Sequence, residues 1–575
     1  MAATQYAADT PLLVTGLVAT AGIFPLWRLW IYALAFLLMG FILGQSWRRA
    51  GILTDAEFTE IRYSGRWAAV LRALKAIHLG TFINCTVLAM VLIAATRIVE
   101  PFLVWHEWLP TACLTPLSNF LEHFHLSLTS LPETDASVWI QSADNLISIL
   151  LITGFTALYS AVGGLRSVVA TDVVQFIIAI AATACYACIL VGKIGGFEEI
   201  SRQLHQLYGA SSAKSILSFA PSTLDSASFL FMGVLAVQWF AQMNADGTGY
   251  LAQRTMACRT DSDAKQAAVV FTFSQILLRS LLWLPIAVGL LILYPATHLP
   301  LASESSEAFR VARENTFALG IRDFLPPGIR GLMLTGMLAA LASTIDTHLN
   351  WGASYWTNDL YKRFLAKKLW GREPRSSELV WVARFSTAGI LGIALLLAVR
   401  LSSIQSAWHL SLLLGSGLGV PLILRWLWWR INLWSEIAGG ISSLIFSWGL
   451  LSFFPDFSES ARLLIITGLS TATVLIVTLL TPPEPKDRLI SFYLRVRPPG
   501  FWGPVAAAVE SSAAEPLKRL MSGTRAVGLC TLSIFLLLTG LGRIFTGSGL
   551  QTSVSLSILS GVLLIPFWHR FAFRK

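Results

Sequence analysis

Three short polar clusters interrupt long apolar stretches of this 575-residue chain. Polar side chains inside such stretches are costly to bury and are therefore functional candidates. In one cluster, Ala340, Ser343 and Thr344 share a helical face, where two hydroxyl oxygens beside small residues suit a hard cation. Asp346 adds a carboxylate to the same helix. Because Ser and Thr in membrane helices more often bond the carbonyl four residues earlier, a purely structural role stays open.

The other two clusters each predict a broken helix. Pro11 lacks a backbone N–H and disfavours helix at the preceding residue, so residues 7–11 (AADTP) break the first apolar stretch. Two glycines break the sixth stretch within residues 244–249 (NADGTG). Either break alone is also compatible with a kink or a loop end. Because the two lie five stretches apart, an odd offset, they indicate an inverted repeat whose first helices are discontinuous.

Composition indicates which elements hold these clusters. Only 13% of the residues are charged, against about 25% in soluble domains, while 55% are hydrophobic and the mean hydropathy is +0.65. These values exclude a set of soluble domains, a disordered chain, a coiled coil and a disulfide scaffold. Unbroken apolar runs such as residues 176–191 predict an all-α polytopic membrane protein rather than a barrel. The runs give about fourteen spans, near 2–22, 26–46, 67–97, 143–162, 169–192, 228–246, 267–295, 329–357, 378–400, 405–425, 433–454, 461–481, 526–545 and 549–568.

The charged residues indicate how the spans are oriented. Lys and Arg concentrate in the loops after spans two, six, eight and twelve, whereas the loop after span three is acidic. By the positive-inside rule, the basic loops and both termini are cytoplasmic. The net charge of +10 therefore favours membrane orientation over nucleic-acid binding. Residues 304–324 form an amphipathic pattern on the outer side, typical of a solvated surface helix or of a lid.

The sequence contains no arrangement typical of an enzyme. HExxH, GxSxG and P-loop motifs are absent, and the one close histidine pair, His123 and His125, does not have a helical ligand spacing. The six cysteines lie mostly in apolar runs, which favours burial over metal or redox chemistry. We therefore expect no catalytic residues and no organic cofactor.

Four segments resemble the sodium:solute symporters, relatives of the sodium/galactose and sodium/proline symporters. The match extends over about residues 1–425, and the first segment is similar to a bacterial branch. The four segments are residues 7–11 (AADTP), 159–175 (YSAVGGLRSVVATDVVQ), 253–257 (QRTMA) followed by Asp263-Ala264, and 340–346 (ALASTID) continuing to 358–361 (NDLY).

The resemblance implies a ten-helix, inverted five-plus-five repeat core that works by alternating access. We expect this transporter core at residues 1–425, with its repeats at about 1–192 and 228–425. Residues 426–575 are expected to add about four transmembrane helices, with a cytoplasmic loop at 482–525.

The resemblance also implies a sodium site between the first and eighth core helices. Its expected ligands are the hydroxyls of Ser343 and Thr344 and the backbone carbonyls of Ala340, Ala3 and Tyr6.

Further implications concern the ion path and the first helix. The family places an acidic residue of the fifth helix near the inner ion exit, and Asp172 occupies that position. Gln5 stands where the proline symporters carry an Asp, which leaves the coupling ion open. Family members have one further helix before the first core helix, whereas Met1 falls inside that core helix. We therefore expect this sequence to lack that further helix, and either the true start lies upstream or the ion site is incomplete.

The sequence thus predicts sodium-coupled symport of a small polar organic solute across the cytoplasmic (inner) membrane. Sodium, the solute and the lipid bilayer are the expected partners. The alternatives are a proton-coupled or uncoupled transporter on the same fold, a non-transporting solute sensor, and a degenerate paralogue. For Gln238 and Trp239, helix packing explains the side chains as well as solute binding does. The expected solute contacts are Asp9, Thr10, Gln238, Trp239, Asn244 and Asp246.

Overall fold

The computed structural model describes most of the chain. It leaves out residues 132–133, 222–224, 243–244, 248, 297–306, 402, 548 and 574–575. It describes the backbone alone at residues 157–169, 250, 406, 410 and 414.

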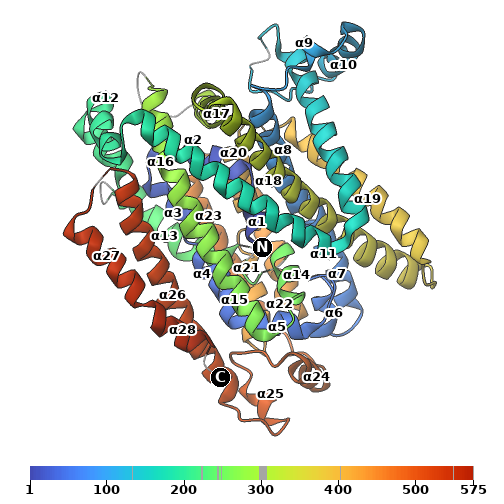
Figure 1. Cartoon of the computed structure of the whole chain (residues 1–575). Helices are drawn as coiled ribbons and strands as arrows, with labels where there is room; N and C mark the ends of the chain where they lie inside the picture. Colours follow the sequence, from blue (N-terminus) through green and yellow to red (C-terminus); the bar gives the residue numbers. More distant parts are fainter. Residues whose placement is uncertain are drawn as a thin grey trace.

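The described chain is built from helices, most of which run side by side across the molecule (Figure 1). Eleven of its helical segments are long and apolar enough to cross a membrane, and two shorter apolar helices, α2 and α13, accompany them. The first part of the chain forms α1 (Ala2–Gln5), α2 (Asp9–Ala21), α3 (Trp27–Trp30), α4 (Ala33–Leu37), the π-helical η2 (Leu38–Leu43), α5 (Gly44–Ala50), α6 (Phe58–Arg62), α7 (Arg66–Ile77), η3 (His78–Ile83), α8 (Asn84–Val99), α9 (Trp105–Trp108), α10 (Thr111–His123), α11 (Val138–Ile194) and α12 (Phe197–Leu217).

The second part repeats the pattern of a broken helix followed by long spans. It forms α13 (Ser226–Ala241), α14 (Tyr250–Met256), α15 (Asp261–Thr272), η4 (Phe273–Leu278), α16 (Arg279–Leu293), α17 (Glu307–Phe324), α18 (Pro327–Ser354), η5 (Tyr355–Leu369), α19 (Ser376–Ala398), α20 (Ile404–Gly415) and α21 (Gly419–Leu427). Beyond these lie α22 (Leu433–Phe453), α23 (Glu459–Leu480), α24 (Lys486–Val496), α25 (Gly503–Ala507), α26 (Glu515–Phe545), α27 (Thr552–Leu563) and α28 (Ile565–Phe573).

Both predicted helix breaks are confirmed. The first separates α1 from α2, and Tyr6 at the break has φ −77° and ψ 61°, outside the helical region. The second separates α13 from α14, where Gly247 and Gly249 have φ values of 87° and 90°. Residues with side chains rarely adopt such positive φ values, so the glycines permit this turn. The chain therefore carries the inverted-repeat architecture with discontinuous first and sixth helices.

The fourth and fifth spans differ from the prediction at their junction. Two separate helices were expected at 143–162 and 169–192, but α11 is helical from Val138 to Ile194. Two parts of α11, Val138–Thr156 and Ala170–Ile194, are each long and apolar enough to cross a membrane, in agreement with the two predicted spans. Figure 1 shows α11 turning back on itself, with its neighbours α10 and α12 at the same upper end of the molecule.

The segment predicted as the cytoplasmic loop 482–525 is partly helical. It contains α24, α25 and the first turns of α26, which begins at Glu515 rather than near 526. Trp502 anchors the loop, because its indole nitrogen donates to the Trp426 carbonyl at 2.6 Å in a fully buried contact. In Figure 1, α24 and α25 lie at the lower end with α5 and α6, opposite the acidic α9 and α10 region.

A buried ionic network fixes the second break. Arg425 of α21 donates from Nη2 to the Asp246 carboxylate at 2.7 Å, and from Nη1 to Glu436 of α22 at 3.1 Å. Lys75 of α7 forms an ion pair with the same glutamate. All four side chains are buried, so each needs its partners to offset the lost hydration. The network therefore connects the sixth helix to the tenth helix and to the first helix beyond it.

Replacing Arg425 with Met is expected to lower stability strongly, because Asp246 loses the counter-ion at 2.7 Å. Removing one partner of a buried ion pair costs about 3–5 kcal/mol, which thermal unfolding of the detergent-purified protein will register as a lower Tm. Arg202→Met is the control, since Arg202 pairs with Glu199 at the exposed surface and a small change is expected. A wild-type Tm for Arg425→Met would contradict the stabilising role of the network.

Candidate ion and solute site

Thr344 connects α18 to the break in the first helix. Its hydroxyl donates to the Ala340 carbonyl at 2.9 Å, the ordinary bond of a helical threonine. The same hydroxyl lies 3.5 Å from the carbonyl of Thr4 in α1. Ala340 and Thr344, which the sequence placed on one helical face, therefore face the first helix where it is interrupted.

The Asp172 carboxylate of α11 lies beside the second hydroxyl of the cluster. Ser343 donates to its Oδ1 at 2.5 Å, and Thr4 donates to its Oδ2 at 3.3 Å. Arg254 of α14 approaches Oδ2 to 3.7 Å and also donates to Thr347 at 3.1 Å. Asp172, which was expected at the ion exit, is therefore in direct contact with Ser343, which was expected to bind the ion.

Tyr6 anchors the break between α1 and α2. Its phenol hydroxyl bonds the Thr183 hydroxyl and lies 3.5 Å from the Ala179 carbonyl, both on α11. Its backbone N–H donates to the Ala3 carbonyl at 3.0 Å. Ala3 and Tyr6 lie on either side of Thr4 in the chain. The carbonyl that contacts Thr344 belongs to Thr4.

The polar atoms gathered between α1, α11 and α18 are mainly oxygens, from carbonyls, hydroxyls and one carboxylate. Oxygen ligands suit a hard cation, whereas transition metals favour imidazole and thiolate. In the part of the chain that the structure describes, no three His, Cys, Asp or Glu side chains are grouped to hold a metal. The chemistry of this cluster therefore fits an alkali cation better than a transition metal.

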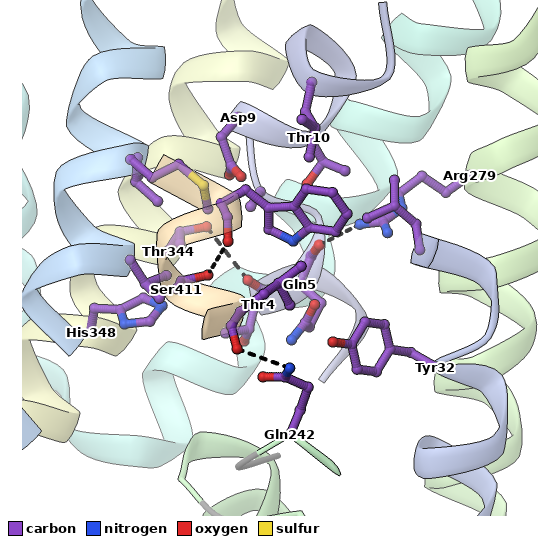
Figure 2. A pocket seen from close by; sticks show the side chains of 18 of the residues that line it. Thr4, Gln5, Asp9, Thr10, Tyr32, Gln242, Arg279, Thr344, His348 and Ser411 are labelled. Carbon is purple, nitrogen blue, oxygen red and sulfur yellow. Dashed lines mark hydrogen bonds between the residues drawn. The ribbon is translucent and has the colours of Figure 1, made fainter. Parts of the chain in front are cut away.

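A cavity of about 200 Å³ adjoins this cluster (Figure 2). Thr4 and Thr344 form part of its wall, so the oxygen cluster and the cavity share a boundary. Asp9 and Thr10, at the start of α2, line it from the other side of the helix break. Its aromatic lining residues are Tyr32, Phe36, Trp351 and Trp408.

Two opposite charges line this cavity. Asp9 is 3% exposed, and its Oδ1 has no hydrogen-bond partner in the described structure. Arg279 of α16 donates to the Gln5 carbonyl at 2.6 Å and stacks 4.5 Å from the centre of the Trp283 ring. No direct ion pair joins Asp9 and Arg279 among the described residues, although Figure 2 shows both at the same cavity.

The other expected solute contacts lie elsewhere. Gln238 is fully buried behind the cavity, where its amide donates to the Tyr32 hydroxyl at 3.2 Å. Trp239 is half-buried and donates to the Ala236 carbonyl one helical turn earlier. Asp246 belongs to the ionic network with Arg425. Asn244 lies outside the described residues.

Sequence reasoning missed several residues of this region. Arg279 carried a usable signal, because it is an arginine within the predicted apolar span 267–295. Thr4, Tyr32 and Trp408 carried none, since threonine and aromatic residues are common in membrane helices. Their place at the cavity depends on how helices distant in sequence meet.

Helix α17 covers the first helix on its outer side and supplies a buried carboxylate. Glu314 is fully buried and accepts hydrogen bonds from the backbone N–H groups of Ile404 and Gln405, at 3.2 and 2.9 Å. These N–H groups begin α20, so the carboxylate caps that helix. A Cβ atom at Gly16 would lie 3.0 Å from Glu314 Cγ, so glycine permits this close approach of α2. Residues 307–324 of the predicted amphipathic segment thus pack against α2 through a buried face, rather than forming a fully solvated surface helix.

Comparison with known proteins identifies the family. A sequence profile of the Sodium:solute symporter family matches residues 140–442, which is more than half of the chain. The chain belongs to the sodium:solute symporter family. As a member of this transporter family with many apolar helices, it is a multi-pass membrane protein.

The curated relatives have low sequence identity to this chain, and the match covers only part of each relative. A sodium/glucose cotransporter of Vibrio parahaemolyticus is 26% identical, over 58% of this chain and 62% of its own length. The osmoregulated proline transporter OpuE of Bacillus subtilis is 27% identical, over 52% of this chain and 56% of its own length. The matches thus span less than two thirds of these relatives. Among solved structures, a Na⁺-coupled sialic acid symporter in an outward-open state shares the fold, with a TM-score of 0.57, 17% identity, and coverage of 84% of this chain and 89% of that one.

The cover over the first helix predicts a pH-dependent stability. Burial raises the pKa of Glu314 from 4.5 to about 7, against the lowering effect of the Gln405 and Ile404 N–H groups and Arg97; Glu307 also raises it. The folded protein therefore binds more protons than the unfolded chain between about pH 4.5 and 7, and this contribution to stability falls as pH rises through that window. We expect Glu314→Gln to flatten the fall in Tm between pH 5 and pH 8 relative to the wild type.

Measuring the difference between wild type and variant across pH isolates this group from all other titrations. Glu122→Gln, a change at an exposed position of α10, is the control and is expected to leave the wild-type slope nearly intact. Parallel pH profiles for wild type and Glu314→Gln would contradict a raised pKa at Glu314.

Proposed function

We propose that this protein couples the entry of Na⁺ to the uptake of a small polar organic solute across the cytoplasmic membrane. The Na⁺ ligands in this proposal are the hydroxyls of Ser343 and Thr344 and the carbonyls of Ala340, Ala3 and Tyr6. The proposal draws support from family membership, from the fold shared with a Na⁺-coupled symporter, and from the oxygen cluster between α1 and α18.

The observation that carries the proposal is the contact of Thr344 with both the Ala340 carbonyl and the Thr4 carbonyl. A cation placed here would draw its ligands from a continuous helix and from a broken one. In a regular helix these carbonyls would accept hydrogen bonds from the following turn. At the break, a bound ion would satisfy them instead. Binding would thus hold α1 against α18, and release would let them separate.

Asp172 has a separate part in this proposal. Its carboxylate accepts from Ser343 and Thr4 and lies near Arg254, so it places negative charge one contact away from the proposed ligands. A carboxylate at this distance attracts the ion during passage without joining its ligands. Arg254 would replace the ion as the partner of Asp172 after release.

The solute would occupy the 200 Å³ cavity, whose wall includes Thr4 and Thr344. Because ion cluster and cavity share these residues, ion binding would shape the solute site directly. The inward electrical potential would add about 2.3 kcal/mol per charge per 100 mV to transport. We further propose residues 1–425 as the transporter core, residues 426–575 as accessory, and no catalytic activity.

A proton-coupled or uncoupled transporter is the second candidate, favoured by the raised pKa of Glu314 next to α2. A solute sensor and a degenerate paralogue share the same fold and are separated from transport by the measurement below.

We expect Ser343→Ala and Thr344→Ala each to weaken Na⁺ binding about tenfold, because each removes one oxygen ligand worth about 1.4 kcal/mol. The Na⁺ concentration that gives half of the maximal rise in Tm should increase by the same factor. Thermal unfolding across a Na⁺ titration, with K⁺ as the counter-titrant, gives this value. The same variants are expected to lose Na⁺-driven uptake into proteoliposomes.

Thr335→Ala is the matched control. Thr335 also lies on α18 and also donates to a carbonyl four residues earlier, but it is exposed and distant from α1. It is expected to retain the wild-type Na⁺ response. Uptake that proceeds equally without Na⁺ and follows a proton gradient would favour the second candidate, and binding without any uptake would favour a sensor.

A further inference from the structure

Asp9 is the one carboxylate that lines the 200 Å³ cavity in the described structure. Its side chain is almost completely buried, and its Oδ1 has no hydrogen-bond partner among the described atoms. Figure 2 shows the side chain of Asp9 directed into the cavity, beside Thr10. A buried carboxylate oxygen without a partner is costly, so an occupant that supplies positive charge would be strongly favoured.

The buried carboxylate Asp246 makes the contrast clear. It is also fully buried, but it accepts from Arg425 at 2.7 Å and from the Trp426 indole at 3.0 Å. Its partners come from the protein itself. Asp9 has no such arginine within ion-pair distance in the described chain, and its Oδ1 lacks a hydrogen-bond partner there.

The walls of the cavity suit an organic cation. The rings of Tyr32, Phe36, Trp351 and Trp408 line it, and aromatic faces attract ammonium groups through the cation–π interaction. Trp408 already holds one cation in this way, because the Arg28 guanidinium lies 5.0 Å from the centre of its ring. Aromatic walls next to a carboxylate are a combination that favours substituted amines over inorganic ions.

A positive charge lies on the same cavity as Asp9. Arg279 is directed to the Gln5 carbonyl and so is held at one side, while Asp9 lies at another. The two charges are not in direct contact, so an occupant with an ammonium group and a carboxylate could face both at once. A neutral sugar or polyol would offer hydroxyls to Asp9 but no charge to either group.

We propose that the solute of this transporter is a small zwitterion, of the amino acid or betaine type, whose ammonium group binds Asp9 between the aromatic side chains. The carboxylate of the zwitterion faces Arg279. This inference rests on the proposed symport function, since it names the solute that the same cavity takes. It also assigns Asp9, rather than Gln238 or Asp246, as the residue that selects the solute.

The test separates binding from transport. Purified protein is screened by thermal unfolding against neutral amino acids and glycine betaine, and in parallel against D-glucose and myo-inositol, with and without Na⁺. We expect one or more zwitterions to raise Tm, and the sugars and polyols to leave it unchanged. Stabilisation by D-glucose or myo-inositol alone would overturn the proposal.

Two pairs of variants locate the interaction. Asp9→Asn is expected to weaken the affinity for the stabilising zwitterion by about tenfold or more, because a charge-assisted contact becomes a neutral one. Tyr32→Leu is expected to weaken it more than Tyr32→Phe, which keeps the ring. The Tm without ligand shows whether each variant folds. If Asp9→Asn does not fold, Asp9→Glu, which keeps the charge, takes its place.

The outcomes distinguish this inference from the symport proposal. Zwitterion binding that depends on Asp9 but brings no uptake would overturn symport and support the inference. Na⁺-driven uptake of a neutral sugar would support symport and overturn the inference. Wild-type zwitterion affinity in Asp9→Asn, together with a lost response to Na⁺, would assign Asp9 to the ion and overturn the inference as well.

Discussion

The structure depends on one constraint, which is that a polar atom inside the membrane needs a partner from the protein or from a ligand. Most buried polar groups of this chain meet it internally. Thr344 bonds the Ala340 carbonyl, Asp246 bonds Arg425, and Glu314 bonds the first N–H groups of α20. Among the described carboxylates with an unpartnered oxygen, Asp9 is the one that lines the cavity.

The two helix breaks satisfy this constraint in different ways. At the second break, charged side chains from α7, α21 and α22 surround Asp246, so the turn is locked by the protein itself. At the first break, Arg279 donates to the Gln5 carbonyl and Thr4 donates to the Asp172 carboxylate, and a cavity lies next to the break. A pair of equivalent elements thus has unequal roles. Charges of the protein itself hold the second break, whereas the first break adjoins a cavity.

The described helices beyond the ten-helix core are more than an appendage. Glu436 of α22 takes part in the ionic network, and Glu459 of α23 holds Arg28 through two bonds of 3.0 and 2.7 Å. Arg28 in turn stacks on Trp408 at the cavity wall. These contacts join the core to helices whose sequence carries no recognisable chemistry.

The sequence by itself determined the membrane class, the broken first and sixth helices, and the hydroxyl face of α18, because hydropathy, Pro11 and the glycines act locally. Only the tertiary structure decided which polar residues meet. Asp9 and Asp246 look alike in sequence, each following an alanine at a helix break, yet one lines a cavity and the other pairs with an arginine 179 residues away. The position of Arg279 beside Gln5 was likewise set by packing between distant helices, which local sequence patterns do not encode.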